Sequence, residues 1–229
     1  MSISKDESRE YKERLYELFS QIGNALANPH RLELLDLLVQ APRTVEELAD
    51  QAHMSIANTS QHLQRLKQAH LVVDERDGQF IRYCLANPAI ARLWFELRSV
   101  AEKQLAEVER ALDRYRSHRS DFERISIEEL HEGMSRDEVV LIDVRPEVEF
   151  QTGHLPGAVS MPIDTLSERI DKLPSSKTIV AYCRGPYCAF ADEALVFLSA
   201  HGFPVKRLEE GVAEWQQAGY WLEKVDLEV

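Results

Sequence analysis

The chain has little cysteine and no long uninterrupted hydrophobic run. Its 229 residues include three cysteines, an odd number that does not fit the paired disulfide framework of a small secreted protein. No stretch approaches the roughly 20 consecutive apolar residues of a membrane-spanning helix, and residues 1–14 are too charged for a signal peptide. These absences predict a cytoplasmic protein with no membrane partner, whose thiols are structural, metal-binding or reactive.

Basic residues are scarce in the second half of the chain. Residues 1–120 carry 17 Lys and Arg against 18 Asp and Glu, whereas residues 121–229 carry 10 against 21. The net charge of −12 therefore comes almost entirely from the second half, which is a poor partner for phosphate backbones. The first half is close to neutral and can carry a local basic face.

The first 118 residues are predicted to form one mainly α-helical domain with a β-hairpin. Asn28-Pro29 offers a helix cap followed by a first-turn proline, and Thr44 to Glu47 fits a capping box. The remaining elements follow from helical or alternating apolar spacing. Helices are expected over residues 7–27, from 29 to about 39, from 45 to about 51 and from 56, and strands over 71–73 and 79–85, joined by a turn at Asp77-Gly78.

A second cap-then-proline pair, Asn87-Pro88, opens an apolar stripe that runs from Ile90 to Tyr115. One helix of about 28 residues at ~1.5 Å per residue would be roughly 40 Å long, more than the width of a small domain. Such a stripe needs a partner surface, and a second copy of the same helix is the simplest one. We therefore expect a homodimer formed through the N-terminal helix and the 88–115 helix; packing against the second domain is the alternative.

From residue 122 onward the pattern changes, after a polar segment over 114–124 that we interpret as a linker. Short apolar strands now alternate with helices, which predicts a parallel α/β sheet covered on both faces over residues 122–229. Strands are expected over 139–144, 158–161, 178–182 and 205–208, and helices near 126–132, 146–151, 166–172, 189–201 and 212–218.

Two short helices around a tight turn, followed by a hairpin, are typical of a winged helix-turn-helix, a DNA-binding fold. The recognition helix is expected to begin at Ser55, with Thr59, Leu63 and Leu66 facing inward. No acid occurs from Ser55 to Gln68, which favours DNA contact over a merely solvated face. The predicted base-reading residues are Ser55, Ile56, Asn58, Ser60, Gln61 and His62, and the predicted phosphate-contacting residues are Arg65, Lys67, Arg76 and Arg82.

Residues 26–86 resemble the ArsR/SmtB family of dimeric bacterial repressors. The resemblance lies in Leu-Ala-Asn-Pro-His-Arg-Leu-Glu-Leu-Leu from residue 26, Ser-Gln-His-Leu-Gln-Arg-Leu-Lys-Gln-Ala-His-Leu-Val from residue 60, and Arg-Tyr-Cys-Leu from residue 82. It implies the fold, the dimer and a double-stranded DNA operator as partner. Many members sense metals through a cysteine pair in the helix before the recognition helix; Thr44 to Glu47 stand there instead, so no metal is expected at that place.

The most reactive stretch of the sequence lies directly after the predicted strand 178–182. Ligand sites in parallel sheets lie beyond the carboxyl ends of the strands, and a loop followed by a helix from about Cys188 directs N–H groups toward such a position. We therefore predict Cys183 as an accessible, anionic nucleophile, with Arg184 as its local cation; a buried, inert cysteine is the alternative. The predicted substrate-binding loop is Arg184, Gly185, Pro186 and Tyr187.

A second thiol closes the same loop. As a hypothesis, Cys183 takes up sulfane sulfur or an oxidant, and Cys188 then attacks it as a resolving thiol, giving a disulfide or a sulfur-bridged form. The alternative is that Cys188 serves as a small apolar residue at the start of its helix. Cys84 alternates with Tyr83 and Leu85 on the wing and is expected to be a partly buried spectator.

Residues 122–223 resemble a rhodanese domain. Three blocks carry the resemblance: Leu-Ile-Asp-Val-Arg-Pro-Glu-Val-Glu-Phe-Gln-Thr-Gly-His-Leu-Pro-Gly-Ala from residue 141, the Cys183 loop, and Gly-Val-Ala-Glu-Trp-Gln-Gln-Ala-Gly-Tyr from residue 211. It implies that Cys183 accepts sulfane sulfur as a persulfide. It also implies structural roles for Asp143, Arg145, Glu149, His154 and Trp215.

The loop departs from that family in one respect. Cys188 stands where sulfurtransferases of the family often have an arginine, and Ala189 stands where related phosphatases have one. Phosphate-ester chemistry is therefore not expected, and use of thiosulfate is weakened.

The sequence thus predicts a DNA-binding regulator, in particular a repressor, whose operator binding responds to sulfane sulfur or redox modification at Cys183. The partners are operator DNA, a second copy of the chain, and a small sulfur species or oxidant; no cofactor and no metal are expected. One alternative is an active rhodanese-type sulfurtransferase in which the helix-turn-helix part only dimerises or tethers. The other is a metalloid-responsive repressor.

Overall fold

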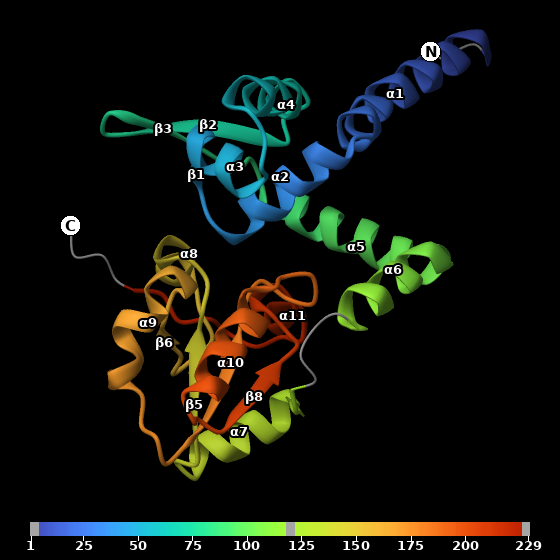
Figure 1. Ribbon diagram of the computed structural model, residues 1–229. Helices are drawn as coiled ribbons and strands as arrows, with labels where there is room; N and C mark the ends of the chain where they lie inside the picture. The colour runs from blue at the N-terminus through green and yellow to red at the C-terminus, as the bar shows by residue number, and fades with distance from the viewer. Residues whose placement is uncertain (1–4, 118–121, 226–229) are drawn as a thin grey trace. The chain divides into compact units, whose positions relative to one another are not determined.

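The computed structural model describes residues 5–117 and 122–225, which form two compact units, Met1–Gln104 and Leu105–Val229 (Figure 1). The division falls within the predicted 88–115 helix. Residues 118–121 of the predicted linker lie outside the described residues. Each unit is described by itself below.

Two helices of the first unit begin at the caps that the sequence predicted. The Asn28 side chain accepts a hydrogen bond from the N–H of Arg31 at 3.2 Å, and Thr44 and Glu47 form the predicted capping box. Its elements are α1 Lys5–Leu26, α2 Pro29–Gln40, β1 Arg43–Thr44, α3 Val45–Gln51, α4 Ile56–Gln68, β2 Val72–Asp77, β3 Phe80–Leu85 and α5 Pro88–Gln104.

The core of this unit confirms the predicted inward stripe of α4. Thr59, Leu63 and Leu66 are fully buried, and the two leucines pack in one cluster with Leu34 and Leu35 of α2. Strand order β1-β3-β2, antiparallel throughout, forms the wing.

The hairpin turn lies one residue later than predicted. Asp77 pairs with Phe80, so the turn residues are Gly78 and Gln79 instead of Asp77 and Gly78. Two-residue hairpins need a positive φ at the first turn position, and Gly78 supplies it with φ 61°.

The prediction of a single helix over residues 88–115 is wrong at one point. α5 ends at Gln104, and α6, Ala106–Ser117, begins after Leu105, whose carbonyl accepts from the N–H of Val108 at 2.8 Å. The interruption removes only a few backbone hydrogen bonds and leaves the helical spacing on each side intact. Because no glycine or proline marks the position, apolar periodicity could not reveal it.

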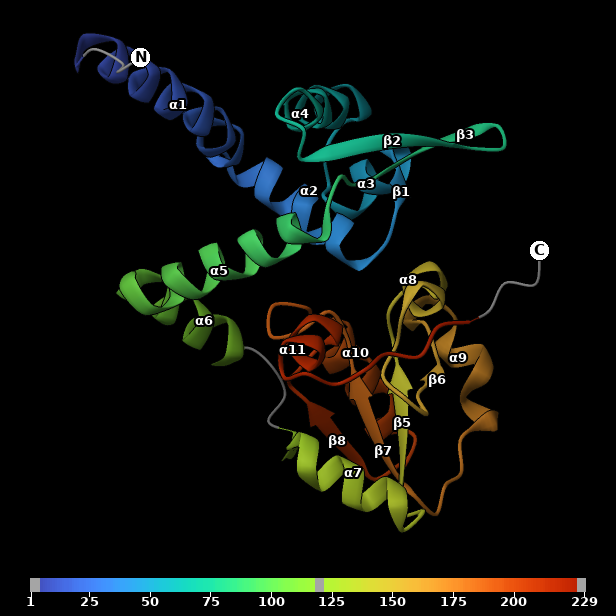
Figure 2. The same ribbon diagram turned by 180° about the vertical axis from the view of Figure 1, so that it is seen from behind.

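The second unit contains the predicted parallel sheet, in strand order β4-β8-β7-β5-β6 (Figure 2). Its strands are β4 Arg124–Ile125, β5 Val139–Asp143, β6 Val159–Ser160, β7 Thr178–Tyr182 and β8 Val205–Leu208. Its helices are α6 Ala106–Ser117, α7 Ile127–Ser135, α8 Glu147–Thr152, α9 Leu166–Arg169, α10 Phe190–Ala200 and α11 Val212–Gln217, with short 3₁₀ turns at Ile163–Thr165 and Ile170–Lys172.

Successive side chains of β7 point alternately into two cores, one on each face of the sheet. This confirms the prediction that both faces of the sheet are covered. Ile179, Ala181 and then Cys183 lie in the core that contains Leu195 of α10. Tyr182 lies in the opposite core, with α7 and α11. Among the described residues, no helix is long and apolar enough to cross a membrane.

Candidate functional site

The N-terminal half of α4 presents most of the predicted base-reading residues. Ser55, Ile56 and Gln61 are exposed, and Asn58 and Ser60 are half-buried. The Ser55 hydroxyl also accepts from the N–H of Asn58 at 3.3 Å and so begins the helix. The first two turns of α4 therefore form a polar surface without an acidic residue.

His62 is less available than the sequence suggested. It is half-buried, and its ring centroid lies 5.4 Å from that of His30 at the start of α2. Burial, followed by the nearby His30 and Arg31, lowers the pKa of His62. The side chain packs against α2 because it follows the inward Thr59 by one turn.

The predicted phosphate-contacting residues divide into two groups. Arg65 and Arg76 are exposed. Lys67 forms an ion pair with Asp74, and Arg82 pairs with Glu47 at 3.1 Å and with Asp77 at 2.9 Å. These pairs are partly exposed, and ion pairs that water reaches contribute only about 0–1 kcal/mol to stability.

The cysteine loop begins directly beyond β7, as predicted, but α10 starts at Phe190 and not at Cys188. Gly185 adopts a φ of 126° inside the loop. The backbone of Gly211 lies against the loop so closely that a Cβ there would stand 2.4 Å from the carbonyl carbon of Arg184 and 2.5 Å from the nitrogen of Gly185. The loop therefore lies directly against the backbone at the start of α11.

Cys183 is not the accessible anionic sulfur that the sequence predicted. Only 2 % of the residue is exposed. Its Sγ lies 3.5 Å from the carbonyl oxygen of Cys188 and 3.8 Å from that of Gly185, and either oxygen can accept the one proton of the thiol. Burial raises the pKa of the Cys183 thiol well above its usual range. The residue continues the buried alternation of β7, and that parity directs its sulfur into the core.

Cys188 has the properties expected of the reactive sulfur. It is partly exposed, and the Cys183 Sγ lies 3.5 Å from its carbonyl oxygen. The neighbouring Cys183 side chain, followed by the backbone N–H of Phe190 and the Arg184 charge, lowers the pKa of Cys188 to about 7. Backbone N–H groups therefore act on both sulfurs of the loop, those of Phe190 and Arg184 on Cys188 and that of Ala191 on Cys183.

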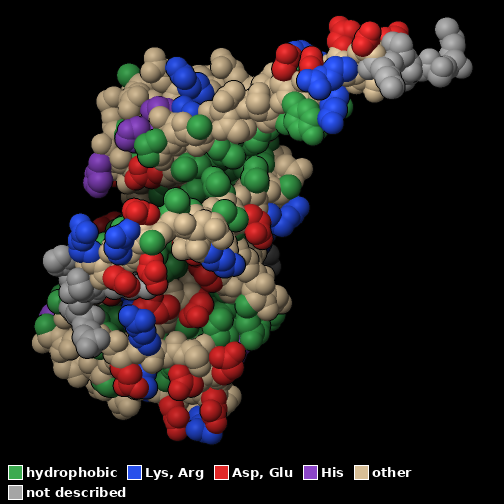
Figure 3. Space-filling model, turned by 90° about the vertical axis from the view of Figure 1, so that its right-hand side faces the viewer, with side chains coloured by type: hydrophobic (Ala, Val, Ile, Leu, Met, Phe, Trp, Pro, Cys, Tyr) green, Lys and Arg blue, Asp and Glu red, His purple; other side chains and the backbone are tan. Residues whose placement is uncertain are grey.

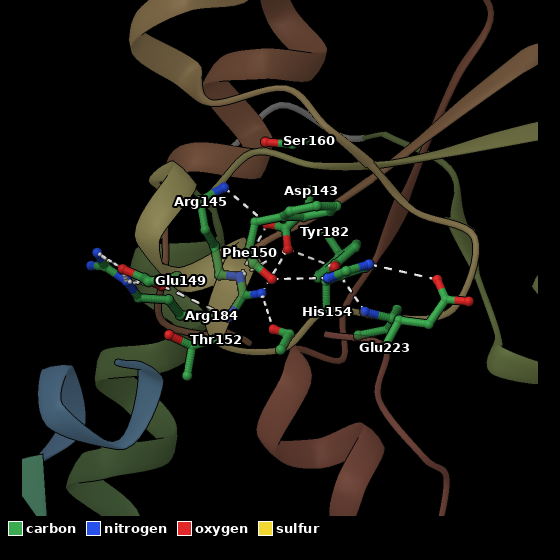
Figure 4. Close-up of polar contacts among 12 residues, drawn as sticks. Asp143, Arg145, Glu149, Phe150, Thr152, His154, Ser160, Tyr182, Arg184 and Glu223 are labelled. Carbon is green, nitrogen blue, oxygen red and sulfur yellow. Dashed lines mark hydrogen bonds and ion pairs between the residues drawn. The ribbon is translucent and has the colours of Figure 1, made fainter. Parts of the chain in front are cut away.

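The Arg184 side chain is fixed by a buried carboxylate, Glu149, whose oxygens accept from its Nη2 at 2.6 Å and its Nε at 3.0 Å (Figure 4). Glu149 is completely buried and also lies 3.9 Å from Arg145. Arg145 in turn binds Asp143 at 2.6 Å, and the Tyr182 hydroxyl donates to Asp143 at 2.6 Å. A buried chain of charges thus connects the sheet to the loop cation.

Two contributors to the site were missed by sequence reasoning. Glu149 was interpreted as structural only, although it holds Arg184. Arg207 of β8 is nearly buried, pairs with Asp192 of α10, and interacts electrostatically with Cys183. An arginine in a buried strand, opposite an aspartate in an otherwise apolar helix, was the available signal. Within residues 5–117 and 122–225, no group of His, Cys, Asp and Glu is arranged to hold a metal ion.

Cys84 lies outside this site. It is half-buried on β3 opposite Val73, and burial, followed by the nearby Glu75, raises the pKa of its thiol. A thiol that is protonated at neutral pH reacts slowly.

Comparison with known proteins gives matches to both halves of the chain. A helix-turn-helix domain model matches residues 26–75, and a rhodanese-like domain model matches residues 126–218. The HTH-type transcriptional regulator Rv0324 of Mycobacterium tuberculosis is 40% identical over 208 residues, which cover 91% of each chain. A sulfurtransferase of Allochromatium vinosum is 27% identical over 84 residues, 36% of this chain and 77% of that one.

Among solved structures, a homodimeric winged helix-turn-helix DNA-binding domain from Mycobacterium bovis, described as a possible ArsR-family regulator, is 36% identical. The match covers 46% of this chain and 94% of that chain, with a TM-score of 0.42.

Fold and site together define a winged helix-turn-helix unit joined to a rhodanese-like unit with two cysteines in its loop. The chain belongs to the ArsR-type helix-turn-helix transcriptional regulators that carry a C-terminal rhodanese-like domain. Both resemblances inferred from the sequence are thereby confirmed.

Proposed function

We propose that the protein is a homodimeric repressor that binds operator DNA through α4 and the wing, and that it responds to sulfane sulfur or an oxidant at the Cys183–Cys188 pair. One observation carries this proposal: the two loop cysteines are in contact, with the Cys183 Sγ 3.5 Å from the Cys188 carbonyl oxygen, on a chain that also carries a recognition helix. Reaction at the pair changes the loop, and the loop change alters the population of DNA-competent dimer.

Exposed apolar side chains support the dimer. On α1, Tyr11, Tyr16 and Phe19 are 67%, 62% and 63% exposed, and on α5 Val100 is 56% exposed. Hydrophobic side chains gather on the face of the first unit beside α1 (Figure 3). Exposed apolar side chains gathered on the helices of a regulator are typical of a protein interface, and a second copy of the same helices would cover them with matching chemistry.

Base reading by α4 is tested with Gln61→Ala. Because Gln can pair bidentately with adenine, its loss should cost about 1–3 kcal/mol of specific binding, which is roughly 5- to 100-fold in affinity. The probe is a duplex selected from a random library by the unmodified full-length protein, and binding is followed by fluorescence anisotropy. Gln68→Ala, at the exposed C-terminal end of the same helix, is the control and should bind as the unmodified protein does.

The response is tested by the Cys183→Ser and Cys188→Ser variants. Both should bind the selected duplex with unchanged affinity and lose the decrease in affinity that polysulfide or peroxide produces in the unmodified protein, because neither can form the Cys183–Cys188 disulfide. Gel shifts before and after treatment measure this. Cys84→Ser is the control and should respond fully; a full response in either loop variant contradicts the proposal.

The same geometry disfavours the alternative of a rapid sulfurtransferase. Cys183 is nearly inaccessible, and Cys188 occupies the position from which an arginine would hold an anionic donor. We expect turnover of thiosulfate with cyanide to stop after about one equivalent of sulfur per chain, in contrast to the steady turnover of an enzyme.

A further inference from the structure

We propose that Arg207 of β8 is a positioning residue for the Cys183 sulfur: its buried guanidinium supplies the positive charge that this sulfur needs when it is anionic. The inference rests on the proposed function and deepens it, because it concerns the same cysteine pair. It holds whichever of the two sulfurs reacts first, since Cys183 is anionic both when it carries a persulfide and when it attacks a modified Cys188.

Strand pairing places Arg207 beside the segment that leads to Cys183. β7 and β8 are parallel neighbours (Figure 2), and Arg207 is paired with Ala181. Ala181 and Cys183 share the face of the sheet that α10 covers, and Arg207 lies on that face too, because it pairs with Asp192 of α10. Neighbouring strands are about 4.8 Å apart and successive residues rise about 3.3 Å, distances that an arginine side chain can span.

The Arg207 guanidinium is buried and only in part satisfied. The residue is 3% exposed; its Nη1 forms an ion pair with Asp192, and its Nε lies 3.4 Å from Glu209. As hydrogen-bond donors, the guanidinium nitrogens have no partner of regular geometry among the described residues. Glu209 is shared with Arg124, at 3.2 Å. A buried cation with unused donors can accommodate one further anion.

Two groups oppose the effect of burial on the Cys183 sulfur. Burial, followed by the neighbouring Cys188 side chain, raises the pKa of the Cys183 thiol, whereas the N–H of Ala191 and the charge of Arg207 lower it. A charge fixed in a core of low polarity acts strongly on a nearby anion, so Arg207 offsets part of the cost of ionising a buried sulfur. The charged and titratable groups packed around the sulfur are Cys188 and Arg184 of the loop, Asp192 of α10, and Arg207 and Glu209 of β8.

The step that Arg207 assists is the uptake of sulfur from a hydropersulfide, R–S–SH. The Cys183 thiolate attacks the outer sulfur, the S–S bond of the donor breaks, and R–S⁻ leaves with the electron pair and takes up the proton that Cys183 lost. Cys183–S–SH forms, and the sulfane sulfur changes partner without net oxidation. Loss of the persulfide proton then gives Cys183–S–S⁻. The attacking thiolate and the persulfide anion both carry the negative charge that the guanidinium compensates.

Alkylation of Cys183 with iodoacetamide tests this role in the full-length Cys188→Ser protein, which cannot form the loop disulfide. Arg207→Met is combined with Asp192→Asn, because loss of one partner alone would leave a buried charge uncompensated. Mass spectrometry should show labelling of Cys183 at about pH 8 slowed by at least 10-fold, and the rise of the rate moved to higher pH, since the thiolate is the reactive form and a nearby opposite charge commonly changes its fraction by a factor of ten or more.

A merely structural role of Arg207 predicts the opposite result. Cys183 is 2 % exposed, so a loosened core would expose its thiol and accelerate labelling. An equal or faster rate in the doubly substituted protein therefore overturns the proposal. Circular dichroism checks that each variant folds.

Two further variants separate charge from packing. Arg207→Lys keeps a cation beside Asp192 and should restore most of the labelling rate; a lysine variant as slow as the doubly substituted protein overturns the proposal. Lys206→Met is the matched control, because Lys206 is the preceding residue of β8 but is partly exposed and pairs with Glu123 at 2.6 Å. It should leave the labelling of Cys183 unchanged.

A small hydropersulfide separates this inference from the proposed regulation. Cys183–S–SH should accumulate in the Cys188→Ser protein, and at least 10-fold more slowly when Arg207→Met and Asp192→Asn are added. If this holds but the DNA affinity of the unmodified protein does not respond to polysulfide, the regulation fails and the role of Arg207 stands. If DNA affinity responds but persulfide forms equally fast in both proteins, the role of Arg207 fails and the regulation stands.

Discussion

Replacement of Arg145 by methionine is expected to lower the stability of the rhodanese-like unit by about 3–5 kcal/mol, because it leaves a buried carboxylate without its counter-charge. Arg145 and Asp143 are both completely buried and paired at 2.6 Å. Arg145 also donates to the carbonyl of Gly153 at 2.8 Å. The substitution therefore leaves two buried acceptors, the Asp143 carboxylate and the Gly153 carbonyl oxygen, without the guanidinium that donates to them.

Hydrogen exchange of the full-length protein measures the loss of stability separately in each of the two units. Protection of the β5 and β7 peptides should fall by about 100- to 4000-fold, the equivalent of the expected loss at 1.4 kcal/mol per factor of ten, and peptides of α4 should not change. Arg136→Met is the control, since Arg136 and its partner Glu132 are each 58% exposed and such pairs contribute at most about 1 kcal/mol. Equal effects of the two substitutions would show that the Asp143–Arg145 pair is not a major stabilising contact.

Most of the fold could be predicted because its signals are local. Caps at Asn28, Thr44 and Ser55 define where helices begin, and the apolar spacing of α4 identifies Leu63 and Leu66 as core. The predictions fail where long-range contacts or the backbone conformation alone determine the local structure. The break at Leu105 has no residue signature, and β4 has only two residues, too few for alternation to be visible.

The candidate site was only partly predictable, for a different reason. The sequence shows that Cys183 follows a strand and that Cys188 closes the loop, but the direction of each carbonyl and N–H depends on the loop conformation. One local signal was available: Cys183 has the same parity as the buried Ile179 and Ala181, so continuation of the strand alternation already favours an inward sulfur. The anchoring of Arg184 by Glu149 joins residues 35 positions apart and could not be inferred from spacing.

The close approach of Gly211 to the cysteine loop leads to the second large effect, that of Gly211→Ala. An alanine Cβ would lie 2.4 Å from the Arg184 carbonyl carbon and 2.6 Å from its oxygen, distances that no rotamer change can relieve because the neighbours are backbone. Either the loop or the start of α11 must shift, at a cost of about 1–3 kcal/mol. A shifted loop no longer aims its N–H groups at the Cys188 sulfur, so the pKa of that thiol should return toward its ordinary range.

Alkylation of Cys188 at pH 7 should therefore slow by roughly 10-fold in Gly211→Ala, since a thiol of ordinary pKa is only a few per cent ionised there. Gly23→Ala is the matched control, because nothing lies within 4 Å of a Cβ at that helical position, and it should leave the rate unchanged. A Gly211→Ala variant that is alkylated at the full rate, with unaltered hydrogen exchange in the loop peptide, would show that the loop amides do not activate Cys188. The low pKa would then have to come from Arg184 and the Cys183 side chain alone.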